Sequence, residues 1–300
     1  MGDFPKIEDS TATCPLCGGG DGVRIHPGNA APPSPEGLRI TDAHYGTVGP
    51  LFRCPACDFR FTPMKGSRLD DLYAEMEDPE YERTRPQRLL QAAKTLETLR
   101  PWKTSGRLLD IGAGSGILVE AAVQAGYQAE GIDPSAWLCQ QAARRGWRVH
   151  AGVLPHPEVV GPFDVVVLMD VLEHVADPLA LLDQAAALLP PGGVGLILTP
   201  DVRSLAARLL GFRWWHYRLA HVGYFSRANL ALALGRAGLE PLLWRRPGWY
   251  FPADYLFKRV MGYLPPPIRQ ESPALLRRFT VPLNLGDSLL CLFRKPPARA

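Results

Sequence analysis

Three glycines and two aspartates form the first pattern in this chain that could carry chemistry. Gly112, Gly114 and Gly116 follow Asp110, where a short apolar run ends. Glycine lets the backbone approach a ligand closely, and the amide groups of a helix that starts there face the ligand. Asp133 lies 21 residues after Gly112 and ends the next apolar run, where a carboxylate can accept both hydroxyls of a ribose. The pattern predicts a site for a nucleoside-containing cofactor.

The glycine spacing differs from that of nicotinamide enzymes. Their fingerprint is G-x-G-x-x-G, which opens onto a pyrophosphate, whereas residues 112–116 read G-x-G-x-G with an aspartate just before them. With the segments that follow, residues 105–245 resemble the class I S-adenosylmethionine-dependent methyltransferases. The resemblance rests on four motifs in order: DIGAGSG at 110–116, GIDPS at 131–135, FDVVVLMDVLEHV at 163–175 and LLPPGGVGLILTP at 188–200.

That resemblance implies a Rossmann-like α/β fold and a set of residues that bind S-adenosylmethionine. The glycines would wrap the methionine part, Asp133 would bind the ribose, and the adenine would lie beside Pro134. Val153 stands where many family members have an acidic residue that contacts the adenine amino group. The full implied set is Asp110, Gly112, Ala113, Gly114, Gly116, Asp133, Pro134, Val153, Leu154, Met169 and Asp170.

Methyl transfer needs the acceptor, the methyl group and the sulfur in line, and a base when the acceptor must lose a proton. Asp170 and His174 follow the fourth predicted strand, and His221 follows the fifth, so we expect these three as candidate catalytic residues. The alternative is that His174 only packs a helix start. The D-x-x-E-H grouping at 170–174 also resembles a divalent-metal set of some quinone-pathway O-methyltransferases.

Four cysteines form two pairs with metal-ligand spacing. Cys14 and Cys17, and then Cys54 and Cys57, each enclose two residues, which is the pattern of a tetrathiolate zinc site. Each pair resembles a zinc knuckle. The residues between the pairs are rich in proline and glycine and too poor in apolar side chains for a core, so we expect a structural Zn²⁺ to organise them. Four cysteine ligands would leave no open position for catalysis.

The positions of the apolar runs predict the elements that must hold these residues. We expect seven strands in an α/β sheet, because short apolar runs alternate with amphipathic stretches. The strands are expected near 107–112, 128–133, 147–150, 163–169, 193–199, 239–246 and 287–295, and helices near 116–126, 135–145, 176–188 and 226–237. The predicted domains are a zinc-binding module at 1–66, a connecting helical segment at 67–104 and a methyltransferase domain at 105–300.

The last third of the chain has its own character. Residues 1–200 carry 17 Lys and Arg against 25 Asp and Glu, and residues 201–300 carry 16 against 5. Two insertions there, at about 201–225 and 249–285, are expected to cap the acceptor site, since insertions at this edge of such a sheet lie over the ligand crevice. The expected substrate-contacting residues are Trp214, Trp215, Tyr217, Arg218, Trp249 and Tyr250.

We expect a small-molecule, sugar or lipid-linked acceptor. The acceptor is expected to be anionic, because arginine and aromatic side chains together suit such a ligand. The segment ADYLFKRVMGYL at 253–264 could lie on a membrane with Leu256, Phe257, Val260 and Tyr263 facing down. The N-terminal residues lack the pattern of a secretory signal, which favours a cytoplasmic, or peripherally membrane-bound, location. The sequence leaves the oligomeric state open.

Two other functions fit the same pattern. An RNA methyltransferase could use the zinc module to bind RNA, although residues 1–66 contain few basic groups, which disfavours a nucleic-acid partner. A non-catalytic methyltransferase-like binding module is the second alternative, and the intact glycines and Asp133 argue against it.

Overall fold

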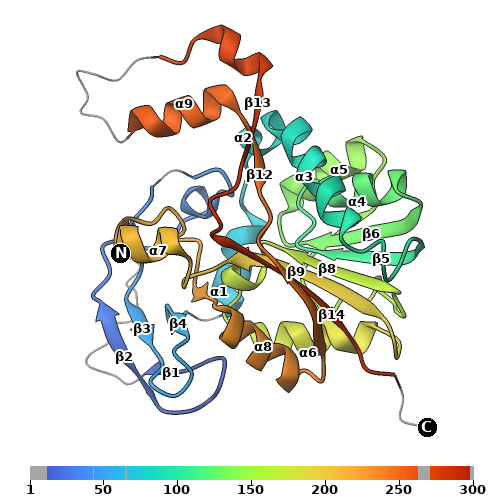
Figure 1. The fold of residues 1–300 in the computed structure, drawn as a ribbon, viewed down its shortest axis with the longest axis horizontal. Helices are drawn as coiled ribbons and strands as arrows, with labels where there is room; N and C mark the ends of the chain where they lie inside the picture. The colour runs from blue at the N-terminus through green and yellow to red at the C-terminus, as the bar shows by residue number, and fades with distance from the viewer. Residues whose placement is uncertain (1–11, 43, 65, 263–270, 298–300) are drawn as a thin grey trace.

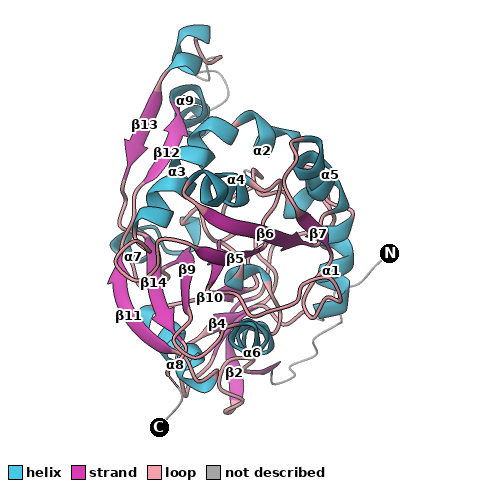
Figure 2. Cartoon of the chain, turned by 90° about the vertical axis from the view of Figure 1, so that its right-hand side faces the viewer, coloured by secondary structure: helices cyan, strands magenta, loops and turns pink. Residues whose placement is uncertain are grey.

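Seven strands form the central sheet: β5 (Gly106–Ile111), β6 (Tyr127–Asp133), β7 (Val149–Ala151), β8 (Val165–Met169), β9 (Val194–Pro200), β11 (Glu240–Arg245) and β14 (Ser288–Arg294). The computed structural model describes residues 12–42, 44–64, 66–262 and 271–297. The strand order is β11-β14-β9-β8-β5-β6-β7, with β14 antiparallel to both neighbours and the remaining pairs parallel (Figures 1 and 2). The predicted Rossmann-like seven-stranded α/β sheet is confirmed.

Strands β8 and β9 are apolar along almost their whole length because both faces of the sheet are covered. Alternate residues of a strand point to opposite faces. In β8, Val165 and Val167 belong to the core on one face, while Val166 and Leu168 belong to the core on the other. Each of these four side chains is fully buried.

Helices α3 (Arg85–Glu97), α4 (Ile117–Gln124) and α5 (Ala136–Arg144) cover one face, and α6 (Pro178–Leu188) and α8 (Arg227–Arg236) cover the other (Figures 1 and 2). Three of these helices, α5, α6 and α8, have an N-cap side chain that accepts a main-chain N–H of the first turn. The N-cap residues are Ser135, Asp177 and Ser226. Such N-caps satisfy amides that have no partner inside the helix. The helices predicted near 116–126, 135–145, 176–188 and 226–237 are present, with bounds close to those expected.

A second sheet joins the N-terminal region to a distant part of the chain. Its strands are β1 (Ala12–Thr13), β2 (Asp21–His26), β3 (Leu51–Arg53), β4 (Arg60–Phe61) and β10 (Gly223–Tyr224). Because β10 pairs antiparallel with β4, the predicted module at 1–66 shares its sheet with the predicted insertion at 201–225. Residues 1–11 of that module lie outside the described residues.

The same insertion contains α7 (Leu205–Leu210) and the short 3-10 helix η3 (Gly211–Arg213). It buries Trp214 and Tyr217 in a cluster with Val48 and Leu51, which come from the N-terminal region. The loop between β2 and β3, with the 3-10 helix η1 at Glu36–Leu38, thus packs on the insertion and not on a core of its own.

The segment predicted to connect the domains folds into three helices, α1 (Gly66–Ala74), α2 (Pro79–Arg83) and α3. The side chain of Asp78 caps α2 and also accepts hydrogen bonds from the main-chain N–H and the hydroxyl of Thr41. Helix α3 packs along α4 and β12, as Figure 2 shows. The segment therefore does more than connect: it covers the edge of the sheet where the glycine loop lies.

The insertion at 249–285 contains a two-stranded sheet of β12 (Trp249–Pro252) and β13 (Thr280–Leu283), with α9 (Ala253–Gly262) and the 3-10 helix η5 (Ala274–Arg278). Figure 1 shows this unit projecting from the main sheet. Of the residues predicted to face a membrane, Leu256 and Phe257 are half-buried, Val260 is 59% exposed and Tyr263 lies outside the described residues. None of the described helices is both long and apolar enough to span a bilayer.

Candidate active site

The loop after β5 needs glycine for two independent reasons. Gly112, Gly114 and Gly116 have φ angles of 74°, 54° and 73°, in the left-handed region that favours glycine. A Cβ on Gly112 would lie 2.4 Å from a methyl carbon of Val171, and one on Gly114 would lie 3.0 Å from the hydroxyl oxygen of Tyr81. The loop is thus packed so closely on Val171 and Tyr81 that neither position has room for a side chain.

Asp133 ties this loop to the neighbouring strand. Its carboxylate accepts the main-chain N–H of Gly114 at 2.7 Å and that of Ser135 at 2.9 Å. Burial raises the pKa of Asp133 to about 6, although both amide hydrogen bonds act in the opposite direction. Burial, together with the charge of Asp133, also raises the pKa of the nearby Asp110 well above its ordinary value. The two predicted carboxylates therefore lie together at the carboxyl edge of the sheet.

Three side chains from α2 and α3 cover the glycine loop, and the sequence patterns did not identify them. Tyr81, Arg88 and Gln91 line a cavity of about 40 Å³ together with Asp110 and Met169. The Arg88 guanidinium lies 4.2 Å from the centre of the Tyr81 ring. In the sequence, Arg88 is one arginine in a helix of polar and apolar residues. That pattern does not tell which side of the helix is turned toward the glycine loop. Gly112 and Ala113, which were predicted to bind the cofactor, also line this cavity.

The residues expected beside the adenine lie around the ends of β6 and β7. The main-chain N–H of Gly152 donates to the carbonyl of Asp133 at 2.9 Å, which brings the following loop next to the second aspartate. Pro134 is half-buried, Leu154 is buried and Val153 is 43% exposed. Their contact with a cofactor stays a prediction.

Asp170 adopts a strained backbone conformation directly after β8. Its φ is 56°, in the left-handed region that costs a non-glycine residue on the order of 1 kcal/mol or more. Its main-chain N–H donates to the carbonyl of Leu198 at 2.8 Å, which holds the conformation in place. Burial raises the pKa of Asp170 to about 7, while Arg88 and Arg218 act to lower it. Strain of this kind gathers at functional sites.

His174 ends the short 3-10 helix η2 (Leu172–His174), and its protonation is defined by its neighbours. Its Nδ1 lies 2.9 Å from the carbonyl oxygen of Ala220 and 2.7 Å from the hydroxyl of Tyr73. A carbonyl can only accept, so Nδ1 carries the proton and Nε2 keeps a lone pair. Burial, and then the charge of Arg218, lowers the pKa of His174 to about 3. The imidazole is therefore neutral near pH 7.

His221, the other candidate base, lies against His174. The ring centres are 4.7 Å apart at an interplanar angle of 87°. His221 is 5% exposed, its Nδ1 has no hydrogen-bond partner among the described residues, and burial lowers its pKa well below the ordinary value. The structure thus brings His174 and His221 together, from η2 and from the insertion before β10.

Glu173 is buried beside the two histidines and connects three elements. Its carboxylate accepts the hydroxyl of Thr199 at 2.8 Å, and its main-chain carbonyl accepts the N–H of Val222. One ligand atom from each of Glu173, His174 and His221 lies within 4.8 Å of the other two. Burial, and then Asp170, raises the pKa of Glu173 well above its usual range. Asp170, expected in the metal-like grouping, is not part of this cluster.

A family model described as a methyltransferase domain matches residues 81–243, which include the glycine loop, Asp133, His174 and His221. The chain belongs to the class I S-adenosylmethionine-dependent methyltransferases. The match begins at Tyr81, the residue that covers the glycine loop. The strand order and the glycine loop of this methyltransferase agree with that family.

Curated relatives and a solved structure resemble this methyltransferase. A ubiquinone biosynthesis O-methyltransferase of Caulobacter sp. (strain K31) is 36% identical over 122 residues, covering 36% of this chain and 48% of the relative. One of the same name from Xanthomonas axonopodis pv. citri (strain 306) is 31% identical over 193 residues, covering 57% and 79%. The chain spans about half the length of the first curated relatives that it matches.

A solved complex of the Haloferax volcanii Trm112 methyltransferase activator with a methyltransferase shares the fold. Its TM-score is 0.52 at 18% sequence identity, and the match covers 76% of this chain and 97% of that chain. At this identity the likeness supports the fold alone.

The four paired cysteines of this methyltransferase gather at one point. Sγ of Cys14 lies 3.7 Å from Sγ of Cys57, and Sγ of Cys17 lies 3.4 Å from Sγ of Cys54. A tetrahedral zinc ion with Zn–S bonds of about 2.3 Å separates its sulfurs by roughly 3.8 Å. All four sulfurs lie within 4.8 Å of one another. The cluster therefore has the size of a tetrathiolate site.

Each cysteine pair is followed by a residue in the left-handed conformation. Gly18 and Asp58 have φ angles of 64° and 61°, and their N–H groups donate to the carbonyls of Cys14 and Cys54, both at 2.9 Å. The N–H of Gly19 lies 3.3 Å from Sγ of Cys17. These are the tight turns of two knuckles, as the sequence pattern indicated.

The residues expected to contact an acceptor occupy two different places. Trp214 and Tyr217 are buried in the cluster between the insertion and the N-terminal region, and Tyr217 accepts a hydrogen bond from Arg60 at 2.7 Å. Arg218 donates to the main-chain carbonyls of Ile40 and Arg39. These contacts give Trp214, Tyr217 and Arg218 roles in the fold. Acceptor contact stays a prediction for all six residues.

Proposed function

We propose that this chain transfers the methyl group of S-adenosylmethionine to a hydroxyl oxygen of a small organic acceptor. The observation that carries the proposal is the placement of the His174 imidazole at the end of η2, with Nδ1 held by the Ala220 carbonyl. Because Nδ1–H is bonded to the Ala220 carbonyl, Nε2 is available to accept a proton. The names of the curated relatives, O-methyltransferases of ubiquinone biosynthesis, support oxygen as the methylated atom and a small molecule as the acceptor.

The residues around the glycine loop fit the cofactor. Gly112 and Ala113 line the small cavity beside the loop, and each carboxylate oxygen of Asp133 keeps a lone pair for a ribose hydroxyl. We expect Arg88 to hold the methionine carboxylate. The present cavity of about 40 Å³ has room for about three water molecules, so the Tyr81 side chain must move when the cofactor binds.

When bound, the cofactor supplies a methyl group that its sulfonium already activates. The residues of this chain have to align the acceptor and remove its proton. Nε2 of His174 accepts the hydroxyl proton as the acceptor oxygen bonds to the methyl carbon and the methyl–sulfur bond breaks. His221, in ring contact with His174, is the alternative base.

The test is an assay with cofactor labelled in the methyl group and a panel of aromatic compounds that carry hydroxyl, amino or only ring-carbon acceptors. We expect label in methyl ethers. His174→Asn should lower kcat by roughly 100-fold while the Kd for the cofactor changes little. Label found only on nitrogen or carbon, or an unchanged kcat in His174→Asn, would contradict the proposal.

For the cysteine cluster we propose one structural zinc ion per chain, held by Cys14, Cys17, Cys54 and Cys57. The sulfur separations and the two knuckle turns support it. Sugar or lipid-linked acceptors, an anionic acceptor, membrane contact and a cytoplasmic location remain predictions from the sequence. An inactive binding module would bind S-adenosylmethionine and yet label no acceptor in the assay.

A further inference from the structure

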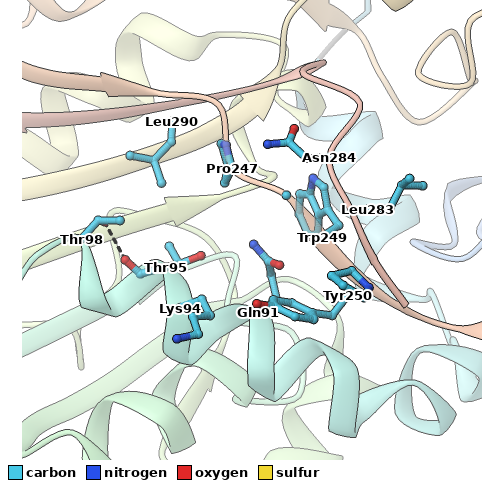
Figure 3. A pocket seen from close by; sticks show the side chains of 12 residues that line it. Gln91, Lys94, Thr95, Thr98, Pro247, Trp249, Tyr250, Leu283, Asn284 and Leu290 are labelled. Atoms are coloured by element: carbon cyan, nitrogen blue, oxygen red, sulfur yellow. Dashed lines mark hydrogen bonds between the residues drawn. The ribbon is translucent and has the colours of Figure 1, made fainter. Parts of the chain in front are cut away.

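A cavity of about 280 Å³ lies between α3 and the β12–β13 sheet (Figure 3). Neither His174 nor His221 lines it. Gln91, Thr95 and Thr98 form its α3 side, and Trp249 and Tyr250 face them from the insertion. An apolar cavity of roughly 150 Å³ is enough for a benzene ring. This cavity therefore has room for a ring that carries substituents.

Two polar atoms in this cavity wall are buried without a partner. Gln91 is 3% exposed and Thr95 is 2% exposed. The Oε1 atom of Gln91 and the Oγ1 atom of Thr95 accept no hydrogen bond from any described residue. A buried polar atom without a partner costs about 1–3 kcal/mol, a cost that a bound donor would remove once the side chain turns into the cavity. By contrast, the Thr98 hydroxyl donates to the carbonyl of Thr95 at 2.6 Å and needs no ligand.

The rest of the wall selects a neutral, flat ligand. Trp249 uses its indole N–H on the hydroxyl of Ser288 at 2.8 Å, so its ring offers the cavity only apolar surface. Leu283 and Pro247 add further apolar surface. Among the described residues that line the cavity, Lys94 is the one charged residue, and its ammonium pairs with Glu97 at 3.0 Å. This part of the lining therefore leaves no unpaired charge for an ionic ligand.

The cavity borders the cofactor site but is separate from the proposed base. Gln91 and Trp249 line both this cavity and the smaller one against the glycine loop, whereas His174 and His221 line neither. A ligand held here would lie on the far side of Gln91 from the loop. It would contact the residues that shape the cofactor site without reaching the methyl acceptor position.

We propose that this cavity is a second binding site, which takes a small neutral aromatic ring bearing an N–H or O–H donor. The Gln91 amide and the Thr95 hydroxyl turn toward the donor and accept its hydrogen bond, and the ring packs on Trp249. The site lies apart from His174 and His221, which line neither cavity.

Benzamide tests the proposal, because it has an aromatic ring and N–H donors but no hydroxyl that could be methylated. Toluene, of similar size and without a donor, is the matched probe. The protein is labelled with ¹⁵N at tryptophan, and the indole signal of Trp249 is assigned by its loss in Trp249→Phe. We expect this signal to shift on titration with benzamide, with a Kd in the millimolar range, and to respond more weakly to toluene.

Two nearly isosteric variants separate ligand binding from structure. Thr95→Val removes the unpartnered hydroxyl, so it should weaken benzamide binding by about fivefold or more while raising the free energy of unfolding. Thr98→Val removes a hydroxyl that already has a partner and should leave the benzamide Kd within about twofold. No shift at tens of millimolar benzamide, equal affinity in Thr95→Val, or equal binding of toluene would each overturn the proposal.

Discussion

At the scale of single residues, Asp133 serves the fold and the proposed cofactor at once. Its two oxygens hold the amides of Gly114 and Ser135, which fixes the glycine loop to the end of β6. The same oxygens have the lone pairs that the ribose hydroxyls would need. Loss of the Asp133 carboxylate therefore removes its own contacts with the cofactor. It also loosens the glycine loop, which makes further cofactor contacts.

We predict that Asp133→Ala raises the Kd for S-adenosylmethionine by roughly 10- to 100-fold, about 1.4–2.7 kcal/mol. Isothermal titration calorimetry measures it. Asp177→Ala is the control, because Asp177 caps α6 by accepting the N–H of Ala180 at 3.0 Å. That change should cost about 1 kcal/mol of stability with no effect on the Kd. Equal losses of affinity in the two variants would refute the role of Asp133.

The buried His174 predicts how stability depends on pH. Its pKa is about 3 in the folded protein and close to 6.5 when unfolded, so the unfolded chain binds the proton more tightly. Stability from this group is complete above pH 6.5 and is lost as the pH falls from 6.5 toward 3. The slope is about 1.4 kcal/mol per pH unit, or roughly 2 kcal/mol between pH 6.5 and 5.

Urea unfolding of wild type and His174→Asn at pH 7 and 5 measures this effect. Asparagine keeps a donor for the Ala220 carbonyl and does not titrate. The raised pKa values of Asp133 and Asp170 act in the opposite direction but are present in both proteins. The wild type should lose about 2 kcal/mol more than the variant on acidification. Parallel losses would mean that His174 is not a buried neutral group.

At the scale of elements, the apolar runs predicted all seven strands of the central sheet, but not the direction that α3 faces. Leu90, which fits the apolar spacing of that helix, is 41% exposed, while the polar Gln91 and Thr95 are buried. Periodicity finds a helix because spacing is local. Which of its sides is covered depends on α4 and β12, which are distant in sequence, so Arg88 and Tyr81 could not be assigned to the site in advance.

The cysteine cluster is coupled to the methyltransferase domain through several elements. Arg236 of α8 donates to the carbonyls of Leu16 and Cys17, and Asn229 donates to that of Cys57 at 2.6 Å. Strand β10, which pairs with β4, follows His221 by two residues. The cluster thus supports the side of the site that holds the histidines, whereas Asp133 is on the other side of β5.

We predict that replacing Cys14 and Cys54 with serine removes about one zinc ion per chain and speeds hydrogen exchange at Gly223 and Tyr224. The Kd for S-adenosylmethionine should stay within about threefold, because the glycine loop does not touch the cluster. Elemental analysis, exchange mass spectrometry and calorimetry measure the three effects. Cys139→Ser with Cys291→Ser is the control, since these buried thiols lie outside the cluster. Metal-free wild type would contradict the zinc site.

At the scale of the whole molecule, much of the positive charge in the last third is used inside the fold. Arg203 pairs with Asp58, Arg246 with Asp201, and Arg294 with Glu240. Arg218 and Arg236 bond to main-chain carbonyls. The sequence shows this charge asymmetry. It does not show whether the arginines form a binding surface or join the insertions to the N-terminal region.

From this we predict no retention on structured RNA at low salt. Binding through many phosphates would fall steeply with salt, with a slope of roughly −0.9 for each duplex phosphate neutralised. Gel shift at two salt concentrations with a stem-loop RNA measures it, with a basic RNA-binding protein as the positive control. Tight binding that weakens steeply with salt would revive the RNA methyltransferase hypothesis.

The pairing of β10 with β4 has a consequence for protein engineering. A fragment that starts at the methyltransferase domain would keep β10 and lose the strand that covers it, together with the partners of Trp214 and Tyr217. An unpaired strand beside exposed aromatic rings is a template for aggregation. Transplanting the catalytic unit into another protein therefore requires the N-terminal third to travel with it.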